Sequence, residues 1–164
     1  MSVFHKTKPS QLPAVLLARV LSGAWRTLPD PLDITEDDLG RITPQLLESG
    51  AAGLVWARAQ HSALKQSPAA GALRQAYRYQ TLQSALQERE IAEIFANLRS
   101  AGVEPILIKG WAVARSYAER GLRPSGDIDL LIRPSQLAAA TRTTDNVNSA
   151  RTRTLPATRW DLPP

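Results

Sequence analysis

The spacing of apolar residues changes at Gly102, and this change divides the chain into two regions of different fold. Before Gly102, apolar residues recur every three or four positions through most of residues 10–100, which is the period of amphipathic helices. After it, residues 103–108 and 127–132 are short apolar runs of the kind that form buried strands. Because helical segments separate and follow these runs, the order predicts an α+β fold, in which an α+β unit follows a helical N-terminal region.

The first part of the helical region carries start and stop signals. A helical stripe runs from Leu12 to Trp25 and is broken by the turn-forming sequence TLPDPLD. Thr35 is placed as an N-cap ahead of three acidic residues, which suit the positive end of the helix dipole. Thr43–Pro44 repeats the start signal and Gly50 supplies a stop, so we expect a new helix between them.

Two further helices are expected before Gly102. One covers about residues 51–66, and the other begins at Ser67–Pro68 and ends at Gly102, which suits a left-handed C-cap. We interpret the apolar stripe of the long helix as a packing face, since helices routinely bury one face. The stripe consists of Leu73, Ala76, Tyr77, Leu82, Leu86, Ile91, Ile94, Phe95 and Leu98.

Composition excludes several kinds of protein. The chain has no cysteine, which excludes disulfides and cysteine-ligated zinc. Aromatic residues make up 5%, and the net charge of +5 comes with scattered arginines, so we do not expect nucleic-acid binding. No apolar stretch approaches the roughly 20 residues of a membrane helix, and the N-terminus lacks a secretory signal. We therefore expect a cytoplasmic protein that does not bind membranes.

Two carboxylates lie two positions apart in the second apolar run. On a strand, Asp127 and Asp129 would share one face with their Cα atoms about 6.5 Å apart, while Ile128 and Leu130 point into the core. Magnesium prefers oxygen ligands, and two carboxylates on one face can share magnesium ions for phosphoryl transfer. A solvated strand edge is the alternative interpretation of this pair taken alone.

Lys109 and Gly110 follow the first apolar run, at the expected start of a helix. Glycine lets the backbone approach a phosphate closely, and a helix N-terminus offers unpaired N–H groups to it. Lys109 would add a positive charge beside the same anion. The alternative is that Gly110 only makes a tight turn between strand and helix.

A resemblance to a known family covers residues 105–137, which read PILIKGWAVARSYAERGLRPSGDIDLLIRPSQL. This stretch resembles the polymerase-beta-like nucleotidyltransferases, and most closely a branch of uncharacterised bacterial members. In that branch a strand leads into Lys-Gly and a short helix, which match Lys109 and Gly110. An Arg-Pro pair then precedes Asp-x-Asp-Leu-Leu, and these match Arg123–Pro124 and 127–131.

The resemblance implies transfer of a nucleoside monophosphate from a nucleoside triphosphate to an unknown acceptor (a small molecule, peptide or protein), with magnesium (Mg2+) as cofactor. Asp127 and Asp129 would be the catalytic residues and the metal ligands. The fold implied is a helical N-terminal region followed by a partial nucleotidyltransferase mixed sheet with flanking helices. The nucleotide-binding residues implied are Lys109, Gly110, Arg123 and Ser125.

The resemblance is incomplete in two places. Trp111 stands where the wider superfamily has serine or a second glycine, and tryptophan cannot donate a hydroxyl hydrogen bond to phosphate. The family also places a third carboxylate on a later strand, but no strand pattern follows Leu137. Asp145 and Asp161 lie in polar sequence without strand character. We therefore expect a truncated chain whose activity is impaired.

Three regions are expected: a helical region (1–102), a partial nucleotidyltransferase core (103–140) and a disordered tail (141–164), whose polar composition cannot offset the entropy of ordering. The alternative to a nucleotidyltransferase is a non-catalytic helical module that binds a protein partner. A nucleic-acid binder would rest on charge alone. Magnesium-dependent nucleotide binding separates the first interpretation from the other two.

Overall fold

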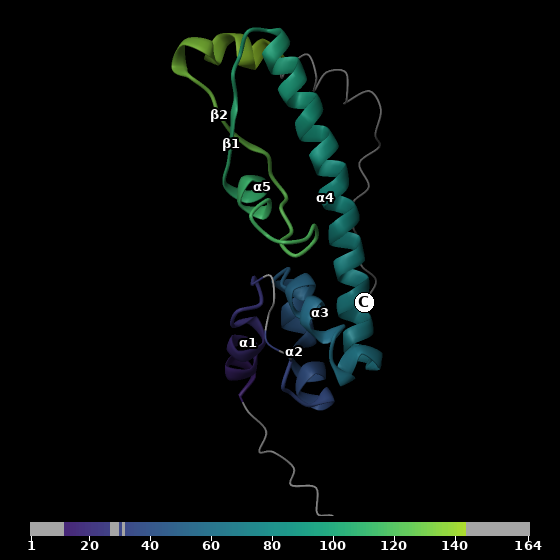
Figure 1. Cartoon of the computed structure of the whole chain (residues 1–164). Coiled ribbons are helices and arrows are strands. Elements are labelled where there is room, and N and C mark those ends of the chain that lie inside the picture. Colours follow the sequence, from purple (N-terminus) through teal and green to yellow (C-terminus); the bar gives the residue numbers. More distant parts are fainter. Residues whose placement is uncertain (1–11, 27–29, 31, 144–164) are drawn as a thin grey trace, which may run out of the picture.

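Helices dominate the chain, and a small sheet lies beside the longest of them (Figure 1). The computed structural model describes residues 12–26, 30 and 32–143, and this part confirms the predicted α+β class. Its elements are α1 (Pro13–Leu21), α2 (Glu36–Glu48), α3 (Ala52–Ala59), η1 (Ala63–Gln66), α4 (Pro68–Ser100), β1 (Ile106–Ile108), α5 (Lys109–Ala114), β2 (Asp129–Leu131) and η2 (Pro134–Gln136).

The segment after η2 is helical over residues 137–143. The tail predicted to be disordered began at residue 141, so its first three residues belong to this helical segment. Residues 144–164, which include the rest of that tail, lie outside the described part.

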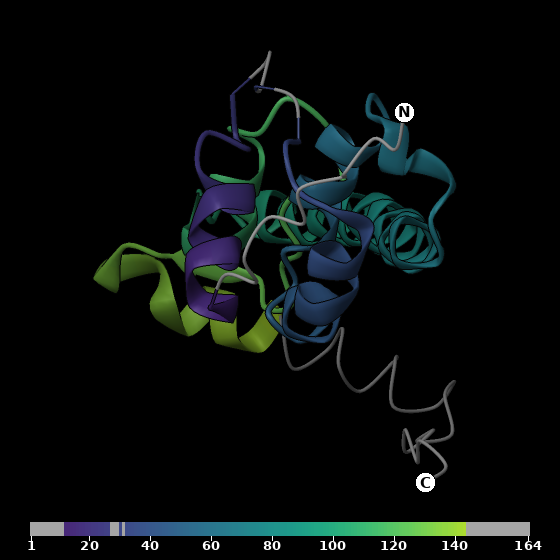
Figure 2. The ribbon, with the colours of Figure 1, turned by 90° about the horizontal axis from the view of Figure 1, so that it is seen from below.

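α2 and α3 pack against the first part of α4, α1 packs against α2 and α3, and the four helices share one apolar core (Figure 2). The predicted stripe of α1 is buried at Leu16 and Val20, but the helix ends at Leu21 and Trp25 is 58% exposed. The single helix expected over residues 51–66 is divided into α3 and η1. The buried members of this core are Leu16, Val20, Leu32, Leu39, Ile42, Leu46, Ala52, Val55, Trp56, Ala59, Ala70 and Leu73.

One of the two predicted start signals in this region begins α2, and the other lies inside the helix. Thr35 caps the helix, because its hydroxyl oxygen accepts a hydrogen bond from the Asp38 N–H at 3.1 Å. The predicted second start at Thr43–Pro44 is wrong, since both residues lie inside α2. The Thr43 hydroxyl donates to the Leu39 carbonyl at 2.7 Å. Pro44 is exposed, so water can solvate the carbonyl group that its missing N–H leaves free.

α4 runs along the length of the described structure (Figure 1) and begins and ends where the sequence predicts. Ser67 caps its start by accepting a hydrogen bond from the Ala70 N–H, and Gly102 follows its end with φ +76. Leu82 and Leu86, which were expected to pack, are 58% and 56% exposed. In the described part of the chain, no helix, α4 included, is both long and apolar enough to cross a membrane.

The sheet consists of two short antiparallel strands beside the second half of α4. The paired residues are Ile106 with Leu131, Leu107 with Leu130, and Ile108 with Asp129. Leu130 and Ile132 pack against a second apolar core, as predicted for Leu130, and this places Asp129 on the other face of the sheet. The buried members of the second core are Leu98, Val103 and Ala140.

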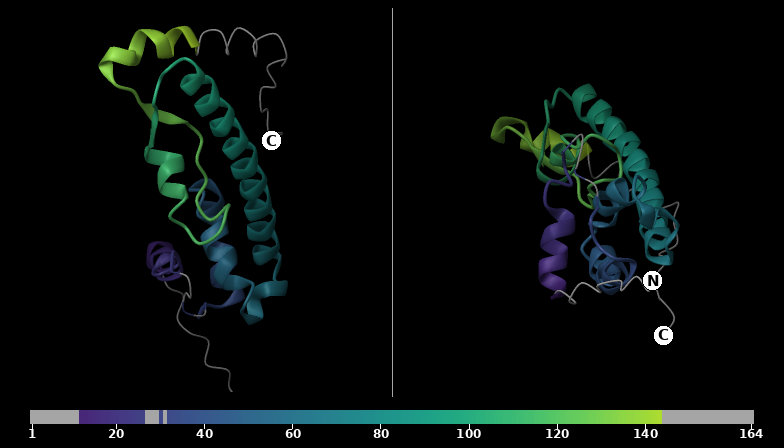
Figure 3. Two further views of the ribbon diagram at one scale, coloured as in Figure 1. Left: turned by 45° about the horizontal axis from the view of Figure 1, so that its top comes forward. Right: turned by 60° about the horizontal axis from the view of Figure 1, so that its bottom comes forward.

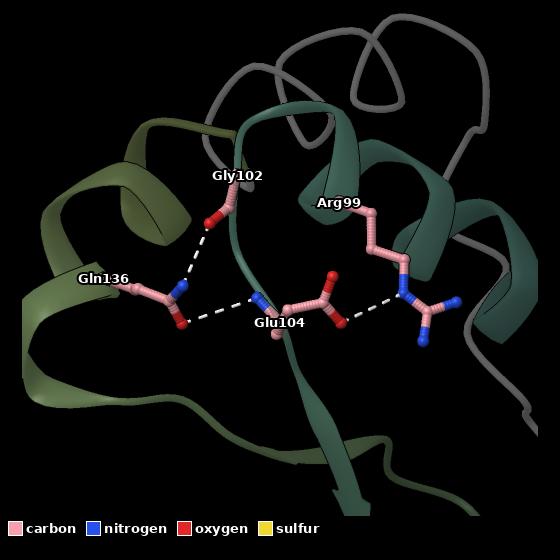
Figure 4. A network of polar contacts seen from close by, with 4 residues as sticks. All are labelled: Arg99, Gly102, Glu104 and Gln136. Atoms are coloured by element: carbon pink, nitrogen blue, oxygen red, sulfur yellow. Dashed lines mark hydrogen bonds and ion pairs between the residues drawn. The ribbon is translucent and has the colours of Figure 1, made fainter.

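The side chain of Gln136 ties η2 to the end of α4 (Figure 4). Its Nε2 donates to the Gly102 carbonyl at 2.9 Å, and its Oε1 accepts from the Glu104 N–H at 3.4 Å. The Glu104 carboxylate in turn accepts from Nε of Arg99 at 3.4 Å. Gln136 therefore satisfies backbone groups of the turn after α4, as a neighbouring strand would, and holds the end of the chain's described part over the second core.

Candidate functional site

The junction between β1 and α5 has a strained backbone. Ile108 ends the strand and Lys109 begins the helix, with no loop between them. Lys109 has φ +52, a left-handed conformation that costs a residue other than glycine on the order of 1 kcal/mol or more. Such residues concentrate at functional sites. α5 ends at Ala114, and residues 119–121 contact α4.

Lys109 and Asp129 form an ion pair at this junction. The register places Ile108 opposite Asp129, so the next residue, Lys109, reaches the carboxylate with its Nζ 3.5 Å from Oδ1. The two side chains are 72% and 35% exposed. Water screens such a pair, and exposed ion pairs contribute only about 0–1 kcal/mol. Another cation can therefore replace the ammonium at the carboxylate for a small cost.

Gly110 is required by the approach of Ser125. A Cβ at Gly110 would lie 2.7 Å from Ser125 Oγ, which is closer than Cβ contacts in proteins. Gly110 was expected to let a phosphate approach the backbone closely. In the structure, the side chain of Ser125 makes this close approach. Ser125 Oγ is itself buried and has no hydrogen-bond partner among the described residues. Because a buried hydroxyl without a partner is costly, an oxygen atom of a ligand or water would be stabilised there.

Asp127 lies in the loop that leads into β2. The strand begins at Asp129, so the alternation expected to place both carboxylates on one face does not extend to Asp127. Its side chain is exposed and has no hydrogen-bond or ion-pair partner among the described residues. Its carbonyl oxygen would be 3.7 Å from a Cβ on Gly110, so Asp127 still lies next to the junction.

Arg123 and Ser125 line a pocket of about 220 Å³ between α4 and α5. Lys109, Asp127 and Asp129 are not among the residues that line it. The structure therefore divides the predicted site residues into two neighbouring groups, which meet where Ser125 contacts the glycine of the junction.

Most charged groups around this pocket already have partners. Arg120 Nη2 lies 2.6 Å from Glu88 Oε2, which joins the pocket wall to α4. The Tyr77 hydroxyl donates to Glu119 Oε2 at 2.8 Å. Burial raises the pKa of Tyr77, and the hydrogen bond to Glu119 and its negative charge raise that pKa further.

Polar residues of α4 hold the segment between α5 and β2 in place, and Figure 3 shows this segment running alongside the helix. Gln87 Nε2 donates to the Gly126 carbonyl at 2.9 Å. The Thr81 hydroxyl donates to the Tyr77 carbonyl of its own helix at 2.8 Å and also lies 3.3 Å from the Arg120 carbonyl. Gly121, at φ +82, passes so close to Thr81 that a Cβ would lie 2.8 Å from the Thr81 backbone nitrogen. These α4 residues support the site, but they could not be predicted, because no sequence pattern other than the apolar stripe distinguishes the positions of α4.

The carboxylates of Asp127 and Asp129 suit a magnesium ion chemically. Carboxylate oxygens are ligands that Mg2+ prefers, and the Lys109 ammonium shows that Asp129 accepts a cation at this position. Across residues 12–26, 30 and 32–143, no three His, Cys, Asp or Glu side chains gather in a way that would hold a metal. Asp145 and Asp161, the other carboxylates weighed from the sequence, lie outside these residues.

Comparison with known proteins identifies a family. A family model with the description "Uncharacterised nucleotidyltransferase" matches residues 35–144, which is more than half of the chain. The match begins at the cap of α2 and includes α4, both strands and every predicted site residue. Searches of curated proteins and of solved structures found no significant match.

Proposed function

Because the chain belongs to the family of uncharacterised nucleotidyltransferases, we propose that it transfers a nucleoside monophosphate from a nucleoside triphosphate to an acceptor, with its nucleotide site at the junction of β1 and α5. One observation carries this location. The Lys109 ammonium and the Asp129 carboxylate lie 3.5 Å apart at a strained backbone position. A triphosphate needs a cation and a metal ion needs a carboxylate, and this junction supplies both.

Each residue of the junction has a proposed role. Asp127 and Asp129 would hold Mg2+, which when bound would neutralise phosphate charge and favour the attacking oxygen. Lys109 would leave Asp129 and bind oxygens of the triphosphate as a point charge. Gly110, packed against Ser125, would keep the start of α5 in position for these contacts.

The proposed reaction exchanges one bond at phosphorus for another. An acceptor oxygen forms a bond to the α-phosphorus, and the bond from the α-phosphorus to the oxygen shared with the β-phosphate breaks. Pyrophosphate leaves with that oxygen, and the proton of the acceptor passes to solvent. Phosphoryl transfer is catalysed mainly by positioning and by electrostatic stabilisation, which are the contributions that Lys109 and the two carboxylates would make.

Transfer of radioactive label tests this function. The purified chain is incubated with Mg2+, a cell lysate as a source of acceptors, and each nucleoside triphosphate labelled on the α-phosphorus. We expect label in an acceptor from the α-labelled nucleotide and none from the same nucleotide labelled on the γ-phosphorus. Asp129→Asn should abolish the transfer, whereas Asp37→Asn, an exposed carboxylate on α2, should not.

Two outcomes would change the proposal. Equal transfer by the parent chain and Asp129→Asn would remove this carboxylate from the reaction. Nucleotide binding without transfer would support the prediction from the sequence that the activity is impaired.

The alternative function, a non-catalytic helical interaction module, is favoured by one surface of α4. Tyr79, Leu82 and Leu86 are all more than half exposed and follow the i, i+3, i+7 spacing of helices that bind in grooves. A chain that binds no triphosphate in the presence of Mg2+ would favour this alternative over nucleotidyl transfer.

A further inference from the structure

A pocket between α4 and α5 adjoins the proposed nucleotide site through Ser125, which lies against Gly110. Pockets for drug-sized molecules typically measure ~300–1,000 Å³. With about 220 Å³, this pocket is below that range. It is large enough for one charged group together with the few atoms that carry it.

Arg123 is one of two guanidinium groups of this pocket that have no ion-pair partner among the described residues, and Arg115 is the other. Arg120 is neutralised by Glu88 at 2.6 Å, and Glu119 accepts a hydrogen bond from Tyr77 at 2.8 Å. Arg123 lines the same pocket and has no hydrogen bond or ion pair with any residue that the structure describes. A guanidinium group presents its N–H donors in a planar fork that matches a carboxylate or a phosphate.

Two further features of the wall suit an anion. Ser125 lines the pocket, and its Oγ is buried against Gly110 without a partner among residues 12–26, 30 and 32–143. Rotation of this short side chain toward the pocket would let an anion accept the unsatisfied hydroxyl proton. Arg115 also lines the pocket, with its guanidinium carbon 5.7 Å from the centre of the Trp111 ring. The stacked ring orients this second positive group without neutralising its charge.

The position of the pocket indicates which substrate would use it. Ser125 contacts Gly110, so the pocket adjoins the proposed nucleotide site, but Lys109, Asp127 and Asp129 do not line it. A transferase must hold its acceptor beside the reacting phosphate. We propose that the pocket binds a carboxylate or phosphate group of the acceptor, an inference that rests on the proposed function for the identity of this substrate.

Calorimetric titration with inorganic phosphate and with acetate tests the pocket. We expect at least one of them to bind, and to bind about tenfold more weakly to Arg123→Gln, since a charge-assisted hydrogen bond is worth about that factor. Ser125→Ala should weaken binding in the same direction. Arg133→Gln, an exposed arginine outside the pocket, should bind as the parent chain does. Binding of neither anion, or binding unchanged by Arg123→Gln, would overturn the proposal.

A second titration separates this inference from the proposed function. The chain is first saturated with Mg2+ and a triphosphate analogue that cannot be cleaved, and the anion is then titrated. We expect the anion to bind still, and to bind equally well to Asp129→Asn, which should not bind the analogue. Displacement of the anion by the analogue would assign the pocket to the triphosphate and overturn the inference. Anion binding by a chain that never binds the analogue would contradict the proposed function and would leave the anion site standing.

Discussion

At the scale of single residues, the ion pair between Lys109 and Asp129 competes with the metal ion proposed for the same carboxylate. Lys109→Gln should therefore bind Mg2+ alone more tightly, by up to about fivefold, since an exposed pair is worth about 0–1 kcal/mol. The same variant should bind the magnesium–triphosphate complex more weakly, because the phosphates lose a cation. Calorimetry with Lys65→Gln as an exposed control measures both affinities. A change of the same sign for both ligands would contradict this role for Lys109.

A second prediction concerns the contact between Gly110 and Ser125. Gly110→Ala should destabilise the fold by about 1 kcal/mol, because the added Cβ lies 2.7 Å from Ser125 Oγ and forces the hydroxyl to move. In a chain that already carries Ser125→Ala, the same change should be neutral or stabilising, since alanine favours helix over glycine. Denaturant unfolding of the four chains measures the coupling, and an equal cost in both backgrounds would contradict it.

The sequence motif predicts that Lys109, Gly110, Ser125 and Asp129 lie near one another. It does not predict the contacts that each of them makes. Lys109 follows the last residue of β1, and Asp129 is the first residue of β2 and pairs with Ile108, so short-range pattern was enough to place them together. The packing of Ser125 onto Gly110 depends on how the intervening segment folds back along α4. No periodicity in the sequence encodes that path.

At the scale of elements, the segment between α5 and β2 depends on a glycine at its contact with α4. Gly121→Ala should cost about 1–3 kcal/mol or more, because φ is +82 and the new Cβ would overlap the backbone of Thr81. Gly126→Ala is the matched control, since nothing lies within 4 Å of its Cβ position. Thermal unfolding should therefore separate the two variants clearly. Equal melting temperatures would show that this segment does not need its close contact with α4.

Helix boundaries could be predicted where a capping residue sets them. They could not be predicted where packing against another element sets them. Thr35, Ser67 and Gly102 act within one turn of the helix end and are confirmed. Pro44 was wrongly predicted to start a helix. It is tolerated inside α2 because it lies on the exposed face of that helix, and this exposure depends on the tertiary packing. Each strand is three residues long instead of the six predicted. Each strand pairs with a single neighbour, and only three residue pairs form between them.

At the scale of the whole molecule, α4 belongs to both apolar cores. Leu73 is buried in the first core and Leu98 in the second, so we expect the described part to unfold as one unit. Leu73→Ala should cost about 2–5 kcal/mol and should speed hydrogen exchange in the β1–β2 pair as well as in α2. Leu98→Ala, the matched change in the other core, should likewise speed exchange in α2. If each variant speeds hydrogen exchange only in its own core, the two regions expected from the sequence to meet at residue 102 unfold separately.

The proposed function requires that Asp127, Asp129 and Lys109 form a site for a magnesium-bound nucleoside triphosphate. Its most direct test is calorimetric titration of a triphosphate analogue that cannot be cleaved, with and without Mg2+. We expect binding that requires Mg2+, that is lost in Asp129→Asn and in Asp127→Asn, and that is kept in Asp37→Asn, because only the first two carboxylates lie at the junction. Equal binding by the parent chain and both site variants, or no binding by any of them, would contradict the claim.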